Sequence, residues 1–298
     1  MMSTSNTDAA PVWQAALWMS GAIVAFTSMA IAGRAVSFEL DTFEIMTYRS
    51  AVGLVVVLLV ARALGHHRTI TKRHMGVHAI RNVGHFFGQN MWFYAITVAP
   101  LAQVFALEFT SPIWVVLLAP LVLGEPLTRD RIAIATLGFV GVLIVARPWA
   151  ETIGPGVITG ALAAIGFAIS ALFTRRLTRT ETITCILFWL TAMQLIFGLI
   201  CAGIDGDLAR PSPQSLPWLG IIALAGLLAH LCLTKALSLA PASVVMPFDF
   251  LRLPVIIGVG ILLYGEPFDV YVLIGGCLIF AVSYLNVWTV RKETQPKT

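Results

Sequence analysis

The chain has 298 residues, of which 58% are hydrophobic and only 11% are charged, and its mean hydropathy is +0.87. Soluble domains carry about 25% charged residues, so a soluble fold is excluded and the chain is expected to lie in a lipid bilayer. It has 19 Lys and Arg against 15 Asp and Glu. The basic residues fall in short clusters between apolar runs, which disfavours nucleic-acid binding.

Ten segments are long and apolar enough to cross a bilayer, because about 20 mostly apolar residues cover its hydrocarbon core. Proline and the residue before it disfavour continued helix, so Pro100 and Pro241 each separate two segments that hydropathy alone would join. The sequence therefore predicts an all-α integral membrane protein with ten transmembrane helices. The predicted spans are residues 13–33, 42–62, 76–97, 101–123, 132–146, 156–174, 183–203, 218–238, 242–264 and 270–290.

Lys and Arg are distributed unequally between the two sides of this predicted bundle. The connections on one side, together with the C-terminal tail, hold twelve of these basic residues. The connections on the other side hold only Arg34, Arg147 and Arg210. Cytoplasmic connections carry the excess of basic residues, so both termini are predicted to be cytoplasmic. The expected location is the cytoplasmic (inner) membrane. The N-terminal residues lack a basic region and a cleavage site, so the first span is expected to be retained. The twelve are Arg62, Arg68, Lys72, Arg73, Arg129, Arg131, Arg175, Arg176, Arg179, Arg291, Lys292 and Lys297.

The cysteines and two neighbouring histidines suggest no metal site. The cysteines form no CxxC pair and no disulfide framework, so we interpret them as small apolar packing residues. They are Cys185, Cys201, Cys232 and Cys277. His74 and His78 have the spacing of a zinc-binding helix but lack the Glu that would activate water, and we interpret them as interfacial side chains. No metal and no cofactor is predicted.

The two halves of the sequence repeat at an offset of 141 residues without a gap. Each half holds five predicted helices, an odd number, so the second copy must cross the membrane in the opposite sense, as in secondary transporters. We predict two inverted five-helix repeats, residues 13–146 and 156–290, between cytoplasmic tails at 1–12 and 291–298. The repeated positions are Ala99-Pro100 with Ala240-Pro241, Gly124-Glu125-Pro126 with Gly265-Glu266-Pro267, Glu108 with Asp249, and Phe109 with Phe250.

These elements resemble the ten-helix carriers of EamA type in the drug/metabolite transporter superfamily, over nearly the whole chain. The resemblance implies alternating access and a central cavity lined chiefly by the third, fourth, eighth and ninth helices. Members move amino acids, purines, flavins, S-adenosylmethionine and metal-chelating metabolites, so the resemblance selects no substrate. The matching elements are Tyr48-Arg49, the turn from Ala95 to Pro100, Pro112, Gly124-Glu125, Gly138, Gly141, Ala236, Ala240-Pro241, Pro254, Gly265-Glu266 and Gly275.

A polar stripe runs along the third predicted span. Its members recur at spacings of three and four residues, so they share one helix face, and ionisable residues inside a span mark candidate function. The stripe consists of His74, His78, Arg81, His85, Gln89 and Trp92. We expect the members from Arg81 onward to line a substrate cavity, with Phe105 and Phe109 of the next span stacking on a flat substrate. Lipid-facing or interfacial positions would explain many of the aromatic residues without a ligand.

Glu108 and Asp249 occupy matching positions in the two repeats. A carboxylate inside a span either pairs with a cation or takes up a proton, and proton uptake would couple transport to protons. Both carboxylates, together with Arg252 and with His230 near the middle of its span, are candidate substrate residues. The structural alternative is that Glu108 pairs with Arg81 and that Asp249 pairs with Arg252.

Pro112 and Pro254 lie near the centres of their predicted spans. A proline removes one helical hydrogen bond, and broken helices at corresponding positions of two repeats mark the binding site of many transporters. We predict that both prolines break their helices and contribute to gating. A packing kink would explain them equally well.

Two further groups of residues are interpreted as structural. In the second span, Arg49 is predicted to join Tyr48 and Glu44 in a local charge network rather than to contact substrate. Small residues make faces for close contact between helices, as Gly84 and Gly88 do in the third span.

Together these features predict a secondary transporter that moves a small organic metabolite by alternating access, driven by protons, exchange or the substrate gradient. Export of amino acids or related metabolites is favoured, and uptake of a heteroaromatic metabolite such as riboflavin or S-adenosylmethionine is the alternative. A channel or a membrane enzyme is a remote alternative, because no P-loop, GxSxG or intramembrane catalytic motif is present. The expected partners are the substrate, the lipid bilayer and candidate coupling protons, with no nucleic acid, and the protein is expected to be a monomer or a homodimer.

Overall fold

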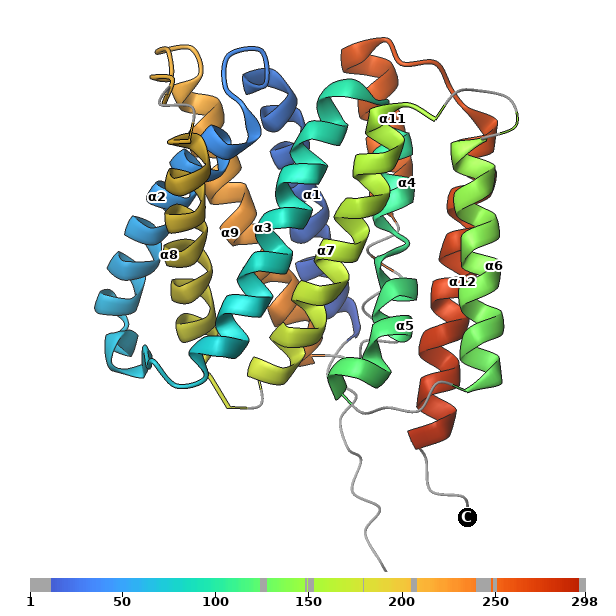
Figure 1. Cartoon of the computed structure of the whole chain (residues 1–298), viewed down its shortest axis with the longest axis horizontal. Coiled ribbons are helices and arrows are strands. Elements are labelled where there is room, and N and C mark those ends of the chain that lie inside the picture. The colour runs from blue at the N-terminus through green and yellow to red at the C-terminus, as the bar shows by residue number, and fades with distance from the viewer. Residues whose placement is uncertain are drawn as a thin grey trace, which may run out of the picture.

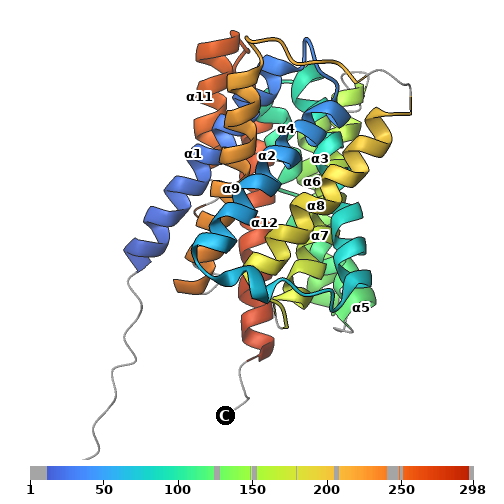
Figure 2. The same cartoon turned by 90° about the vertical axis from the view of Figure 1, so that its left-hand side faces the viewer.

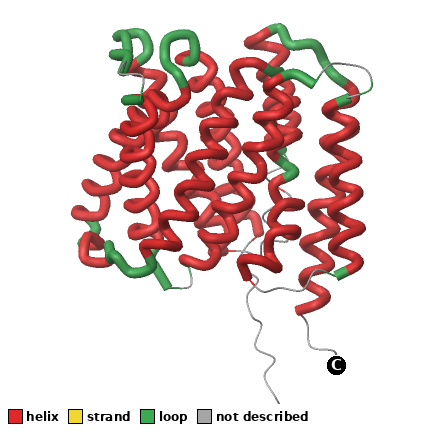
Figure 3. The backbone as a smooth tube through the Cα atoms, in the orientation of Figure 1, coloured by secondary structure: helices red, strands yellow, loops and turns green. Residues whose placement is uncertain are grey.

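Helices and loops make up the whole of the chain that the computed structural model describes (Figures 1 and 3). The described residues are 12–123, 128–147, 149, 153–178, 180–204, 208–239, 248 and 251–294. The α-helices are α1 (Val12–Val36), α2 (Thr42–Ala63), α3 (Met75–Val98), α4 (Leu101–Glu108), α5 (Ser111–Leu123), α6 (Arg129–Ala146), α7 (Pro155–Leu177), α8 (Ile183–Ala202), α9 (Leu216–Leu239), α11 (Arg252–Tyr264) and α12 (Val270–Thr294). A short 3-10 helix, η1 (His66–Thr69), precedes α3.

Five of these helices are long and apolar enough to cross a membrane, and shorter apolar helices accompany them. The five segments are Trp13–Val36, Thr42–Ala63, Pro155–Thr174, Ile183–Ala202 and Leu216–Leu233. Helix α3 is equally long but carries the polar stripe. The prediction of an all-α, multi-pass membrane protein is therefore confirmed, whereas the count of ten crossings stays a prediction.

The predicted span 101–123 is broken into two half-helices. Helix α4 ends at Glu108 and α5 begins at Ser111, and Figure 1 shows the break part-way along the bundle. Pro112 is the second residue of α5, a position where the missing N–H leaves no helical hydrogen bond unmade. In the span predicted over 242–264, α11 begins at Arg252, and Pro254 lies in its first turn. Residues 242–247 and 249–250 lie outside the described residues.

The described chain begins and ends at one end of the bundle, where α1 starts and α12 finishes (Figures 1 and 2). The connection between α2 and α3, which contains Arg68, Lys72 and Arg73, lies at the same end. Arg34 lies in the last turn of α1 and Arg147 directly follows α6, both at the opposite end of the bundle. This arrangement agrees with the predicted charge asymmetry. The side that faces the cytoplasm stays a prediction.

The helices associate in pairs that join the first half of the chain to the second. Helix α1 packs on α9, α2 on α8, α3 on α7 and α6 on α12. A continuous apolar core lies among α1, α3, α4 and α11, where Phe93, Phe105, Leu107 and Ile256 are buried. The pairing places the polar stripe of α3 against helices of the second half.

Glycines allow α3 and α7 to approach each other closely. A Cβ added to Gly166 of α7 would lie 2.6 Å from the backbone of Gly88 and 2.7 Å from the carbonyl oxygen of Gly84. Gly88 in turn faces Ala163 and Phe167. The predicted packing role of Gly84 and Gly88 is confirmed, and Gly166 is their partner.

We expect Gly166→Ala to destabilise the protein by about 1–3 kcal/mol, because the new methyl group would meet backbone atoms that have no rotamer to escape into. Gly220→Ala in α9 is the matched control, since a Cβ there would have no atom within 4 Å. Thermal unfolding of the two variants in detergent tests this. Equal melting temperatures would contradict the close approach of α3 and α7.

At the end of the bundle opposite the termini, Glu39 joins two connections. Its carboxylate accepts hydrogen bonds from the Ser212 amide at 2.5 Å, from the Ser212 hydroxyl at 2.8 Å and from the Ser215 hydroxyl. These donors, the Ser215 hydroxyl first, hold the pKa of Glu39 below its ordinary value of 4.5. The α1–α2 connection is thereby tied to the α8–α9 connection.

Because the pKa of Glu39 is lowered, the stability of the protein is expected to depend on pH. Because the folded-state pKa of Glu39 is lowered, its contribution to stability is complete above about pH 4.5 and is lost as the pH falls through the folded-state pKa. Glu39→Gln is therefore expected to lower the melting temperature at pH 7 and to have a smaller effect in acid. A difference from the unmodified protein that is independent of pH would contradict this assignment.

Candidate substrate site

An ion pair joins the end of α4 to the start of α11. Glu108, the last residue of α4, lies with its Oε1 3.2 Å from a guanidinium nitrogen of Arg252, the first residue of α11. Their side chains are 15% and 4% exposed. The Trp92 indole N–H donates to the other carboxylate oxygen of Glu108 at 2.8 Å. We call these three residues the central polar cluster.

Aromatic rings surround the arginine of this cluster. The Arg252 guanidinium carbon lies 4.7 Å from the ring centroid of Phe26, 5.3 Å from that of Phe105 and 5.2 Å from that of Phe109. A guanidinium at these distances is stabilised by the negative faces of the rings. The structure thus brings together five of the predicted site residues, which are Trp92, Phe105, Glu108, Phe109 and Arg252. It adds Phe26, for which the sequence offered no signal beyond an apolar residue in a span.

Two histidines extend the site toward α9. The ring centroids of His85 and His230 are 5.7 Å apart, and His85 also lies 6.0 Å from Phe167. The rings of His230 and Phe26 form a T-shaped pair with their centroids 6.0 Å apart. Phe26 therefore contacts both His230 and Arg252. The predicted candidates His85 and His230 therefore lie beside the central polar cluster.

Arg81 does not pair with Glu108, the partner that the structural alternative gave it. Its guanidinium donates to the Thr174 hydroxyl of α7 at 3.0 Å and to the Asn82 side chain at 2.8 Å. The structural alternative that Glu108 pairs with Arg81 is therefore wrong, because Arg252 takes that place. Asp249, the predicted partner of Arg252, lies outside the described residues.

Gln89 and His85 present unused polar atoms to the interior. Both side chains are buried, and the Gln89 Nε2 and the His85 Nε2 have no hydrogen-bond partner among the described residues. Buried polar groups without partners are uncommon, and a ligand or water is the usual explanation. Contact of Gln89 and His85 with a substrate stays a prediction.

The predicted charge network around Arg49 is wrong. Glu44 accepts from the Ala209 amide at 2.5 Å and closes a capping box with Asp41, while the Tyr48 hydroxyl donates to the Ala209 carbonyl. Arg49 instead lies near Met46 and, with His230, lines a small cavity of ≈ 20 Å³. That volume is about that of one water position. Glu44 and Tyr48 hold a loop, and Arg49 belongs to the interior.

A second ionic network closes the turn between α3 and α4. The Arg34 guanidinium donates to the carbonyls of Ile96 and Ala99 at 2.5 and 2.6 Å and pairs with Glu266 at 2.5 Å. The Glu266 carboxylate also accepts from the Leu101 amide at 3.0 and 3.1 Å. Arg34 therefore caps the end of α3, and Glu266 caps the start of α4.

Sequence reasoning missed this network although it singled out both of its charged residues. Glu266 belongs to the repeated Gly-Glu-Pro motif, and Arg34 is one of the few basic residues on its side. Gly265 ends α11 with φ +62°, a conformation that glycine adopts readily, and this turn directs Glu266 back toward α4. A cavity of ≈ 280 Å³ adjoins it, and the Arg147–Asp269 ion pair at 2.6 Å lies on the cavity wall.

The chain matches the EamA-like transporter family twice, over residues 13–147 and over residues 154–288. It belongs to this family. The recognition from sequence is confirmed, and the protein is a transporter rather than an enzyme.

Curated relatives of this EamA-like protein carry transporter names. It is 25% identical to an S-adenosylmethionine uptake transporter of Rickettsia conorii, over 94% of each chain. It is 33% identical to a riboflavin transporter of Rhizobium johnstonii, over 74% of this chain and 72% of the relative, and 27% identical to a riboflavin transporter of Vibrio cholerae, over 95% and 96%. A solved crystal structure shares the fold, with a TM-score of 0.62, 17% identity and coverage of 94% of this chain and 99% of the other.

The Arg34–Glu266 pair yields a stability prediction. Both side chains are largely buried, so removing one partner leaves an uncompensated charge, and Arg34→Ala is expected to cost about 3 kcal/mol. Arg210→Ala, at an exposed position on the same side, is the matched control and is expected to change little. Thermal unfolding of Arg34→Ala, Glu266→Ala and the double variant measures the coupling. Fully additive losses would contradict a direct interaction.

Proposed function

We propose that this EamA-like transporter carries a small heteroaromatic metabolite across the inner membrane by alternating access, with the central polar cluster and its aromatic rings as the substrate site. The observation that carries the proposal is the Glu108–Arg252 pair at the ends of two half-helices, enclosed by Trp92 and Phe105. Discontinuous helices expose polar backbone at mid-membrane, where transporters bind substrates.

Two inverted five-helix repeats, residues 13–146 and 156–290, are part of this proposal. Exchanging the halves turns the α1–α9 contact into the α7–α3 contact and leaves the α2–α8 and α6–α12 contacts unchanged, as expected for two copies related by a two-fold axis. The two family matches, whose starts are 141 residues apart, support the same division. Ten crossings, with both termini in the cytoplasm, also agree with α1 beginning and α12 ending at one end of the bundle.

The lining of the site favours a flat substrate with a polar or charged group. Trp92, Phe105 and Phe109 provide ring faces, whereas Glu108 and Arg252 provide one charge of each sign. A cationic substrate would compete with Arg252 for Glu108, and an anionic one would compete with Glu108 for Arg252. The names of the relatives, which include riboflavin and S-adenosylmethionine, support this class for the chain.

Several finer predictions from the sequence stay predictions. No contact in the described part of the chain favours export of amino acids. We therefore place uptake of a heteroaromatic metabolite first. Coupling to protons would require Glu108 to separate from Arg252 and to bind a proton during the transport cycle. The oligomeric state, monomer or homodimer, likewise stays a prediction.

Uptake into proteoliposomes tests the proposal. Labelled riboflavin and S-adenosylmethionine would be compared with an amino acid, and we expect saturable uptake of one heteroaromatic compound. Arg252→Ala and Trp92→Phe are expected to weaken its binding about tenfold or more, equal to about 1.4 kcal/mol. Trp114→Phe is the matched control, because Trp114 packs on Phe139 of α6 instead of joining the central polar cluster.

Two outcomes would contradict the proposal in different ways. Saturable transport that Arg252→Ala and Glu108→Gln leave unchanged, at normal amounts of folded protein, would show that the site lies elsewhere. Transport of the amino acid with no uptake of either heteroaromatic compound would overturn the substrate class and leave the family assignment intact.

A further inference from the structure

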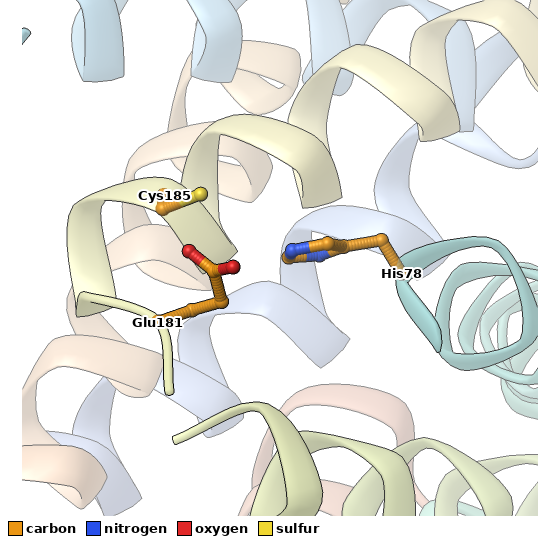
Figure 4. A group of neighbouring side chains, drawn as sticks. All are labelled: His78, Glu181 and Cys185. Carbon is orange, nitrogen blue, oxygen red and sulfur yellow. The ribbon is translucent and has the colours of Figure 1, made fainter. Parts of the chain in front are cut away.

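Three potential metal ligands meet at the end of the bundle that holds the chain termini, away from the substrate site. His78 lies in the first turn of α3, Glu181 in the connection between α7 and α8, and Cys185 in the first turn of α8. One ligand atom from each residue, an imidazole nitrogen, a carboxylate oxygen and the thiol sulfur, lies within 4.8 Å of the other two. Figure 4 shows the imidazole pointing toward the carboxylate and the thiol from the opposite helix.

The histidine of this cluster is fully buried and unpartnered. His78 is 0% exposed, so the contact with lipid headgroups that an interfacial side chain would make is absent. Neither of its ring nitrogens has a hydrogen-bond partner among the described residues, and the same is true of the Glu181 Oε1. Leaving a buried polar atom without a hydrogen bond is unfavourable, so several such atoms facing one another call for an explanation.

Ordinary hydrogen bonds account for the remaining polar atoms. The Thr71 hydroxyl donates to Glu181 Oε2 at 3.0 Å, and the Cys185 thiol lies 3.7 Å from the Thr71 carbonyl oxygen, to which it donates. The Thr71 carbonyl also accepts from the Trp189 indole at 2.7 Å. These contacts fix the thiol and one carboxylate oxygen in place. The atoms that they leave over are those that face His78.

The donor set matches one class of metal ion. Imidazole, thiolate and carboxylate are together the ligands of zinc, whereas magnesium and calcium take oxygen ligands only. Zinc–ligand distances of about 2.0–2.3 Å put tetrahedral ligand atoms roughly 3.3–3.8 Å apart. The observed separations, all within 4.8 Å, exceed this range by at most roughly 1–1.5 Å. Small side-chain rotations would close that gap, and water would complete the tetrahedron.

We propose that His78, Glu181 and Cys185 form a binding site for a zinc-like transition-metal dication. Because the ligands come from α3 and from the α7–α8 segment, a bound ion would hold these elements together. The site revises our interpretation of Cys185 as a packing residue and our expectation of no metal. It does not depend on the identity of the transported substrate.

Direct metal titration tests the proposal. The full-length protein, reduced, stripped with a chelator and freed of any histidine tag, would be titrated with ZnCl₂ and with CoCl₂. We expect one equivalent of zinc to bind and to raise the melting temperature, while MgCl₂ does not. Cobalt is expected to give the absorption of a thiolate-bound tetrahedral ion.

Matched variants separate this site from adventitious binding. Cys185→Ser, His78→Gln and Glu181→Gln are each expected to weaken zinc binding at least about tenfold, and Cys185→Ser should abolish the cobalt–thiolate absorption. Cys201→Ser and Cys277→Ser, which alter thiols outside the cluster, are expected to change neither readout. Because Cys→Ser is nearly isosteric, this variant tests the site even where His78→Gln fails to fold.

No binding of zinc at one equivalent would overturn the proposal. Binding that is unchanged in Cys185→Ser and Glu181→Gln would also overturn it, by showing that other groups hold the ion. The unpartnered atoms of His78 and Glu181 would then be satisfied by water.

Discussion

The structure depends on one constraint, which is that every backbone polar group within the membrane must find its partner inside the protein. Two turns between helices illustrate this constraint, one at Ala99-Pro100, at the end of the bundle opposite the termini, and one at Phe109-Thr110, part-way along the bundle. At the first turn, Arg34 and Glu266 bind the carbonyls and amide that the helix ends leave open. Charged side chains are retained in an apolar bundle here because they satisfy backbone groups as well as each other.

The second turn lies next to an ion pair between two helices that are far apart in the sequence. At this break Glu108 pairs with Arg252 and accepts from the Trp92 indole, and the Arg252 guanidinium lies over aromatic rings. An ion pair whose partners belong to two separate half-helices can be opened by a charged ligand, since the ligand replaces one partner. In the function that we propose, the break between α4 and α5 forms part of the substrate site, whereas the turn between α3 and α4 is a structural joint.

Predictions from the sequence succeeded for local features and failed for most pairings. Helix bounds, the break near Pro112, the buried stripe of α3 and the membership of Trp92, Phe105, Glu108 and Arg252 in one region were all accessible, because they follow from hydropathy, proline chemistry and helical periodicity. The partners of Arg81 and Arg49 were predicted wrongly, and Phe26 was missed. Asp249 lies outside the described residues, and its predicted role stays a prediction.

By itself, the sequence determined that this protein is a helical membrane protein of repeated halves, because composition, periodicity and repeat spacing are properties of the chain. Only the tertiary structure decided which charges meet. Glu108 and Arg252 are 144 residues apart, and Arg34 and Glu266 are 232 residues apart. Such contacts depend on how each helix is rotated and shifted against its neighbours. The same holds for His78, Glu181 and Cys185, whose meeting requires the close packing of α3 against the second half.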